Sequence, residues 1–341
     1  MASTFSFGFS GDDIDIDIDN DVEGSDHGVA RIEQNKPSNN NKLFPAKRHI
    51  LSEWASQITI FLQKEKTTIA RRELFDVRTQ LMAEDDDDDS ELIAGLEQGD
   101  LKPNFYEGGF KTWECALDLA DVLLLPSEKG GELSLSKDGD GLHVVELGCG
   151  TAVPSLAVFA RLLSLPLPNP ETEKKQRFRF TLADYNSTLQ KEEEEEGELD
   201  IEPALLDAFQ TDLSNRGITL DFISGGWSAE FVQLVLDPNL SSTASTATLI
   251  LASETIYAPS SLGVFSKTLI ELLRHSGQRH TATALIAAKK VYFGVGGGVD
   301  EFLQVLYKQP LREGEGSIEV QERKEINSGG VKRVVLEVRI R

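Results

Sequence analysis

VVELGCGTAVP, residues 144–154, carries the pattern that decides the fold of this chain. The mostly apolar run Val144–Leu147 is typical of a buried strand, and Gly148 and Gly150 allow a sharp backbone turn with no side chain in the way of a ligand. A helix starting near Ala152 would direct its free N–H groups and the positive end of its dipole into the space above the turn. The stretch therefore predicts a strand, a glycine turn and a helix that together bind the polar or anionic part of a nucleotide-like molecule.

The composition limits the class of protein. The chain has 341 residues, 40% of them hydrophobic, which is enough for one large or two ordinary domains with a buried core. Its 34 Lys and Arg against 57 Asp and Glu give a net charge of −23, which disfavours direct nucleic-acid binding. The acidic balance is compatible with a basic protein substrate, although acid runs also simply keep flexible segments soluble.

Two cysteines are too few for a disulfide framework or a zinc site, and we assign no metal ligand. Without a secretory signal or a long apolar run, we expect a soluble intracellular protein.

Strands alternate with helices after the glycine turn. Strand candidates cover residues 178–184, 218–224, 247–253 and 283–289, with helical segments such as 203–213 and 262–274 between them. This alternation predicts a parallel sheet with helices on both faces. Two further segments of alternating polarity flank Asn327–Gly330, which predicts a terminal antiparallel hairpin. An ordinary dinucleotide-binding domain does not usually finish this way.

The chain before residue 101 differs in character. Residues 1–43 include the acidic run DDIDIDIDND and predict a disordered acidic and polar tail. Residues 44–100 predict an extension packed on the core, with a solvated acidic loop at Glu84–Asp89. Within the extension a helical stripe is formed by Leu51, Trp54, Ile58 and Leu62. The main domain is expected at 101–341.

The carboxyl ends of the predicted parallel strands are where a ligand is expected. Asp184, at the end of the second strand, can accept two hydrogen bonds from a ribose diol, or it can cap a turn. Trp227, after the third strand, can flank an adenine ring or fill the core. The residues themselves leave both pairs of alternatives open.

Two glycine-containing segments lie outside this central pattern. Tyr106–Gly109 predicts a flexible turn ahead of a helix, and Trp113 at the start of that helix can close over a ligand or anchor the core. GVGGG, residues 294–298, follows the fifth strand but lacks the Lys-Ser/Thr ending of a phosphate-binding loop. It is interpreted as a mobile rim loop that can admit a peptide.

The motif ELGCG, which begins with Glu146, resembles motif I of the seven-strand S-adenosylmethionine-dependent methyltransferases more than a GxGxxG fingerprint. Six blocks in order resemble the histidine protein methyltransferases of the methyltransferase-like group: FYEGGFKTWECALDL, VVELGCGTAVP, LADYNS, SGGWS, ILASETIY and KKVYFGVGGG. They span roughly residues 100–340, and the upstream ARRELFDVRTQLMAED looks similar to fungal members. The resemblance implies an α/β fold with a Rossmann-like seven-strand sheet that ends in an antiparallel hairpin.

The resemblance also implies a cofactor, S-adenosyl-L-methionine, and residues that contact it. The implied cofactor contacts are Thr112, Trp113, Glu114, Cys115, Ala116, Glu146, Gly148, Gly150, Asp184, Tyr185, Asn186, Gly226, Trp227 and Ser253. Glu254 and Tyr257 look like the acidic-x-x-aromatic motif that borders the acceptor channel in related lysine methyltransferases, and they are the implied catalytic pair. The acidic run LQKEEEEEGELD after Asn186 resembles an insertion, so the alignment of the helix that follows it stays open.

The implied activity is methylation of a histidine, at its tele nitrogen, in the L-three protein of the large ribosomal subunit. A neutral imidazole already has a lone pair, so strong base catalysis is unnecessary, and Glu254 or Tyr257 is expected to accept a hydrogen bond from the other ring nitrogen. The expected partner is thus a protein substrate, with no nucleic acid and no membrane. We expect a monomer in the cytoplasm and nucleus.

The sequence leaves three alternative functions open. The same fold can methylate lysine, because the acidic-x-x-aromatic motif is shared. A scaffold that binds a ribosomal protein and keeps a vestigial cofactor site is a second alternative. An NAD-linked oxidoreductase is a third, although the missing third glycine and the terminal hairpin argue against it.

Overall fold

The structure is a computed structural model that describes residues 47–49, 61–64, 67–70, 111–124, 141–167, 176–185, 203–237, 246–276, 282–294, 296–327 and 330–341. In this part of the chain the main sheet has the strand order β1-β6-β5-β4-β7-β8-β10-β9. Its strands are β1 (Lys47–His49), β4 (Gly141–Leu147), β5 (Phe178–Asp184), β6 (Ile218–Ser224), β7 (Thr246–Ser253), β8 (Ala282–Lys289), β9 (Ile318–Ile326) and β10 (Arg333–Ile340).

The strands β4 to β8 are parallel and lie close to their predicted bounds. The terminal hairpin is confirmed as β9 and β10, and β10 is inserted antiparallel between β8 and β9. The seven strands β4 to β10 therefore form the predicted Rossmann-like sheet. The strand order reverses at β4, which has β5 on one side and β7 on the other, so the crevice for a ligand lies at the carboxyl end of β4.

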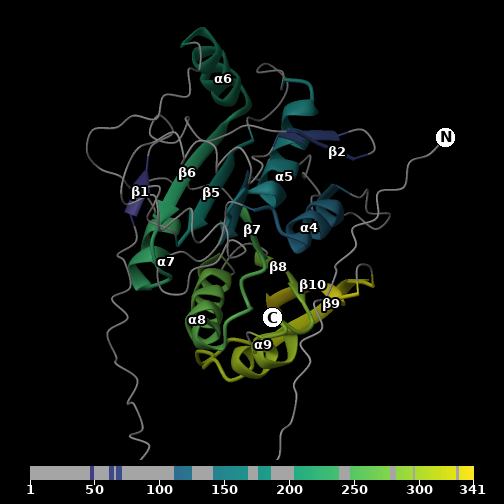
Figure 1. Ribbon diagram of the computed structural model, residues 1–341. Coiled ribbons are helices and arrows are strands. Elements are labelled where there is room, and N and C mark those ends of the chain that lie inside the picture. Colours follow the sequence, from purple (N-terminus) through teal and green to yellow (C-terminus); the bar gives the residue numbers. More distant parts are fainter. Residues whose placement is uncertain are drawn as a thin grey trace, which may run out of the picture. The chain divides into compact units, whose positions relative to one another are not determined.

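Helices cover both faces of this sheet (Figure 1). They are α4 (Glu114–Leu124), α5 (Val153–Ser164), α6 (Pro203–Arg216), α7 (Ala229–Val235), α8 (Pro259–Ser276) and α9 (Val299–Leu306). Successive side chains of a strand point to opposite faces, so Val144 of β4 packs with α4, α5 and α6, whereas Val145 packs with α7, α8 and α9. The predicted segments 203–213 and 262–274 are confirmed as parts of α6 and α8. No helix in the described ranges is long and apolar enough to span a membrane.

The N-terminal extension contributes strands. β1 pairs antiparallel with β6 and extends the sheet at that edge, which the sequence pattern did not predict. β2 (Phe61–Lys64) and β3 (Thr67–Ala70) form a separate antiparallel pair. The predicted helical stripe is wrong at Leu62, which lies in β2, because pairing with the β-branched run in β3 favours a strand there. The other residues of the stripe, the tail 1–43 and the acidic loop Glu84–Asp89 lie outside the described residues.

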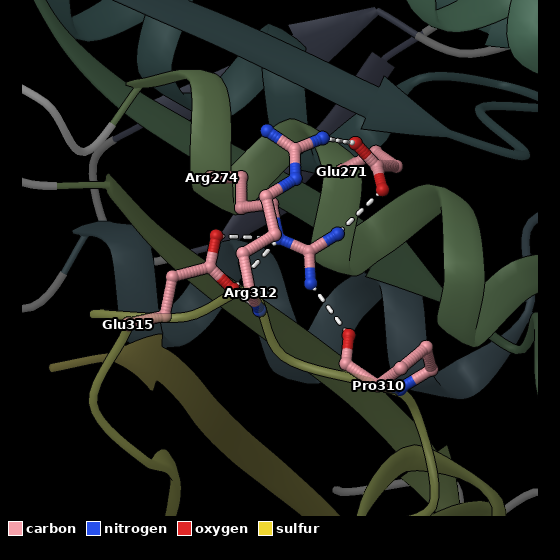
Figure 2. A network of polar contacts seen from close by, with 5 residues as sticks. All are labelled: Glu271, Arg274, Pro310, Arg312 and Glu315. Atoms are coloured by element: carbon pink, nitrogen blue, oxygen red, sulfur yellow. Dashed lines mark hydrogen bonds and ion pairs between the residues drawn. The ribbon is translucent and has the colours of Figure 1, made fainter.

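A polar network anchors the connection between α9 and β9 to the last turns of α8 (Figure 2). Arg274 of α8 donates to both carboxylate oxygens of Glu315, at 2.7 and 2.9 Å, and to the carbonyl of Pro310 at 2.6 Å. Arg274 and Arg312 also share the carboxylate of Glu271. The network therefore fixes the segment that leads into the terminal hairpin.

Candidate active site

The glycine turn after β4 has the geometry that its sequence requires. Gly148 has φ +65° and Gly150 φ +46°, values in the left-handed region that favours glycine. A Cβ on Gly148 would lie 2.9 Å from Cγ2 of Thr255, so a side chain at this position meets both strain and a clash. Helix α5 begins at Val153, next to the predicted Ala152. The first turn of this helix therefore lies at the carboxyl end of the central strand.

Glu146 lies beneath the turn. Its side chain is fully buried, and its Oε2 accepts a hydrogen bond of 2.9 Å from the backbone N–H of Ser155 in the first turn of α5. Burial of the carboxyl, with a smaller contribution from the nearby Asp184 carboxylate, outweighs the lowering by the hydrogen bonds from Ser155 and raises the pKa of Glu146 to about 8. The other oxygen, Oε1, has no hydrogen-bond partner within the described part of the chain. Glu146 thus caps the first turn of α5 with Oε2, and its Oε1 is available to accept a hydrogen bond from a bound group.

Asp184 connects the carboxyl ends of three neighbouring strands. Its Oδ2 accepts a 2.8 Å hydrogen bond from the N–H of Gly150, and its carbonyl accepts one of 2.9 Å from the N–H of Gly225. Asp184 therefore does cap the glycine turn. The same hydrogen bond holds its carboxylate at the crevice, where it could also accept hydrogen bonds from a ribose. Tyr185 follows at the same rim and is half-buried, whereas Asn186 lies outside the described residues.

The start of α4 closes one side of the turn. Thr112 and Thr151 are hydrogen-bonded through their hydroxyls at 2.9 Å, which brings α4 beside Gly150. Trp113 is half-buried and lies under two cations: the Nζ of Lys111 is 4.7 Å and that of Lys289 5.2 Å from the ring centroid. The following residues of the helix, Cys115 and Ala116, are buried. Among the described residues, Trp113 contacts these two cations at the rim and belongs to none of the hydrophobic clusters.

The residues after the third parallel strand, β6, pack against the hydrophobic core. Gly226 is buried, and the ring of Trp227 lies 5.0 Å from that of Phe265 in α8. Trp227 also packs against the main hydrophobic cluster. Of the two roles considered for Trp227, the structure shows the core contact.

Glu254 follows β7 at the rim, next to the half-buried Ser253. Its backbone is left-handed, with φ +56°, and its N–H donates to the carbonyl of Ala287 at 3.0 Å. This conformation costs energy for a residue with a Cβ, and strained residues of this kind cluster at functional sites. The side chain is 9% exposed, and its Oε1 has no hydrogen-bond partner among the described residues. The nearest cation is the Nζ of Lys289, 3.6 Å from Oε1.

A cluster around Glu254 joins α4 to the end of β8. Lys289 also pairs with Glu114 of α4, with 3.3 Å between Nζ and Oε2. Burial raises the pKa of the Cys115 thiol and of the Tyr292 hydroxyl, and the neighbouring Glu254 carboxylate raises both further. Both groups therefore remain protonated beside it. Lys289 and Tyr292 were visible in the sequence only as residues ahead of a glycine loop, and no motif indicated that they approach Glu254.

The second predicted catalytic residue, Tyr257, lies next to Tyr292. Its ring is 6.4 Å from that of Tyr292, in an edge-to-face arrangement. Its carbonyl lies against Gly297, where a Cβ would come within 2.1 Å of the oxygen. Glycine at 297 is therefore required by this close approach.

The mobility predicted for the loop at residues 294–298 stays a prediction, but backbone hydrogen bonds connect its described residues to the turn after β8. The N–H of Tyr292 donates to the carbonyl of Gly297, and the N–H of Gly296 donates back to that of Tyr292. Val291 and Gly298 form a β-bridge, and Gly297 and Gly298 are buried. Gly297 and Gly298 therefore serve close backbone packing, whereas the ring of Phe293 is exposed.

The residues at this rim fit S-adenosylmethionine. Gly148 leaves room that a Cβ would fill, and Asp184 is fixed where it would hold the ribose hydroxyls. A cationic group bound near Glu146 would satisfy its orphaned Oε1 and lower its raised pKa. Thr112 and Trp113 at the start of α4 would cover the bound cofactor from the side.

The sheet order and this rim define a seven-strand methyltransferase that uses S-adenosylmethionine. No known family model matches the chain. It is 34% identical over 271 residues to Histidine protein methyltransferase 1 of Saccharomyces cerevisiae, covering 69% of this chain and 67% of the relative. It is also 34% identical over 255 residues to the protein of that name from Schizosaccharomyces pombe, covering 71% and 69%. The chain belongs to the histidine protein methyltransferase family.

Similar solved structures are more distant. OxaC aligns with a TM-score of 0.34 and 11% identity, over 75% of this chain and 52% of that one. A putative S-adenosylmethionine-dependent methyltransferase from Streptococcus mutans aligns with a TM-score of 0.32 and 13% identity, over 68% and 52%. At these TM-scores the likeness carries no weight in the assignment.

Proposed function

We propose that this protein transfers a methyl group from S-adenosylmethionine to the tele nitrogen of a histidine in a large-subunit ribosomal protein. The names of the yeast relatives support a histidine of a protein as acceptor. The ribosomal target rests on the resemblance of the six sequence blocks.

The observation that carries the acceptor assignment is the buried Oε1 of Glu254, which faces the Lys289 ammonium at 3.6 Å but accepts no hydrogen bond from the described residues. Desolvating a carboxylate oxygen without a hydrogen bond is costly, so the site gains when a donor arrives. The N–H of a neutral imidazole is such a donor. When Glu254 accepts from one ring nitrogen, the other nitrogen keeps its lone pair and is held in one orientation.

The chemistry then needs alignment rather than a strong base. S-adenosylmethionine supplies an electrophilic methyl carbon attached to a sulfonium. The imidazole lone pair forms the new N–C bond while the C–S bond breaks and its electrons stay on sulfur. Positive charge develops on the ring, and the carboxylate of Glu254 stabilises it in a site with little water. The ring returns to the neutral form when it loses the proton that faces Glu254.

The test is to incubate the purified protein with isotope-labelled S-adenosylmethionine and the isolated ribosomal protein, and to locate the label by mass spectrometry. Gly148→Arg is the inactive control, because Gly148 has no room for a side chain. A single methyl on one histidine, absent with the control, supports the proposal. Label on lysine would replace the acceptor, and cofactor binding without any transfer would favour the scaffold alternative.

We further propose that the protein acts as a monomer in the cytoplasm and nucleus, where a ribosomal protein is made and assembled. Light scattering after gel filtration tests the first part, and imaging of a fluorescent fusion tests the second. A stable dimer, or residence in another compartment alone, would contradict these two statements respectively.

A further inference from the structure

The ammonium group of Lys289 lies in a cage of aromatic rings and carboxylates. Its Nζ is 3.3 Å from the carboxylate of Glu114 and 3.6 Å from that of Glu254. The same atom lies 5.2 Å from the ring centroid of Trp113 and 5.9 Å from that of Tyr292. Four side chains, from the first residue of α4 and the residue before it, from the loop after β7 and from the turn after β8, therefore converge on one cation.

Such an arrangement is what a protein uses to bind an ammonium group. Aromatic faces attract a cation through their quadrupole, and carboxylates compensate its charge. Burial alone lowers the pKa of Lys289, but the Glu254 and Glu114 carboxylates outweigh burial, and the pKa is raised. Lys289 thus stays cationic at neutral pH, and the cage is filled by the protein's own side chain.

We infer that Lys289 determines acceptor specificity: its ammonium occupies the place in which the ammonium of a lysine acceptor would be bound before it loses its proton and can be methylated, so that the site takes a neutral imidazole and rejects a lysine side chain. The inference rests on the proposed function, because it assumes that the acceptor approaches Glu254. It extends that function by naming the residue that separates histidine from lysine on a fold able to methylate either.

The charges of the cluster explain the discrimination. An incoming lysine ammonium would meet the like charge of Lys289 and would find Glu254 already compensated. A neutral imidazole carries no net charge, and its N–H can still donate to Oε1 of Glu254. Without Lys289, the cage of two rings and two carboxylates would be open to a cation.

The first experiment compares methyl transfer to the substrate protein with its acceptor histidine intact or replaced by lysine. Lys289→Met removes the ammonium and keeps most of the length of the side chain, whereas Lys289→Arg keeps the charge. Lys290→Met is the matched control, because Lys290 pairs with Glu322 and Glu325 of β9 instead. We expect the histidine-to-lysine rate ratio to fall by about tenfold or more in Lys289→Met. Lys289→Arg and Lys290→Met should keep the ratio of the unchanged protein.

The second experiment is independent of turnover. Imidazole and butylammonium are titrated by NMR into each variant saturated with S-adenosylhomocysteine, above the pKa of imidazole. The unchanged protein should prefer imidazole, and Lys289→Met should gain affinity for butylammonium by about tenfold. Equal butylammonium affinity in the Met, Arg and unchanged proteins, each shown to bind S-adenosylhomocysteine, would overturn the inference. Failure of the unchanged protein to methylate histidine would refute the proposed function but would leave this binding result interpretable.

Discussion

Lys289 of β8 and Arg333 of β10 lie directly opposite each other in the sheet. Both reach the same helix, since Lys289 pairs with Glu114 and Arg333 pairs with Asp118, one turn further along α4. Two adjacent cations of the sheet therefore hold the acidic side of α4. The start of this helix lies beside the glycine turn, so these pairs also determine the shape of the candidate active site.

Arg333→Met should destabilise the protein by about 2 kcal/mol, because it leaves Asp118 unpaired in a partly buried position. Asp118→Asn in the same chain should recover much of the loss. Urea unfolding of the two single variants and the double variant measures the coupling. Strictly additive losses would show that the pair does not hold α4.

Gly148→Ala should abolish most cofactor binding. The added Cβ meets Cγ2 of Thr255 at 2.9 Å, and alanine at φ +65° costs about 1 kcal/mol or more. Gly263→Ala in α8 is the matched control, because a Cβ there meets nothing within 4 Å and alanine favours a helix. Calorimetric titration with S-adenosylhomocysteine distinguishes them. Equal affinity in both variants would be inconsistent with the geometry of the turn.

Glu146→Gln should change how stability depends on pH in the absence of cofactor. The folded pKa of Glu146 is raised to about 8 from its ordinary value of 4.5, so the contribution of Glu146 to stability is full below pH 4.5 and is lost as the pH rises through about 8. Glutamine has no such titration. As the pH rises from 4.5 to about 8, the free energy of unfolding of the Gln variant should therefore increase relative to that of the unchanged protein. Parallel pH profiles from urea unfolding would argue against a protonated, buried Glu146.

Arg274→Lys should weaken the anchor of the terminal hairpin (Figure 2). A lysine ammonium cannot reproduce the planar set of hydrogen bonds to Glu315, Glu271 and the carbonyl of Pro310. We expect a loss of about 1 to 3 kcal/mol in urea unfolding. Arg312→Lys, at a more exposed position of the same network, should cost less. The reverse order of the two losses would contradict the description of the network.

Much of the fold was predictable because its signals are local. The apolar strands after Val144 and the helices between them follow from periodicity, and the terminal hairpin follows from its glycine-containing turn. The position of β10 between β8 and β9 was not predictable, because pairing order depends on packing across the whole sheet. Leu62 was misassigned for the same reason, since its strand pairing outweighs the helical spacing.

The site was predicted less completely than the fold. The glycine turn and Asp184 form the expected rim, because strand ends of a parallel sheet meet at one edge. The burial of Glu146 beneath the turn and the approach of Lys289 to Glu254 depend on tertiary packing of α5 and α4. The glycines at 296–298 were interpreted as flexibility, whereas Gly297 provides room for the carbonyl of Tyr257.

The most direct test of the account is the effect of Glu254→Gln on turnover and on cofactor affinity, measured on the same preparation. The amide keeps the size of the side chain but removes the charge that stabilises the methylated ring. Turnover on the histidine substrate should fall by about a hundredfold, while the dissociation constant of S-adenosylhomocysteine changes by no more than about twofold. Unchanged turnover would show that Glu254 does not hold the acceptor imidazole.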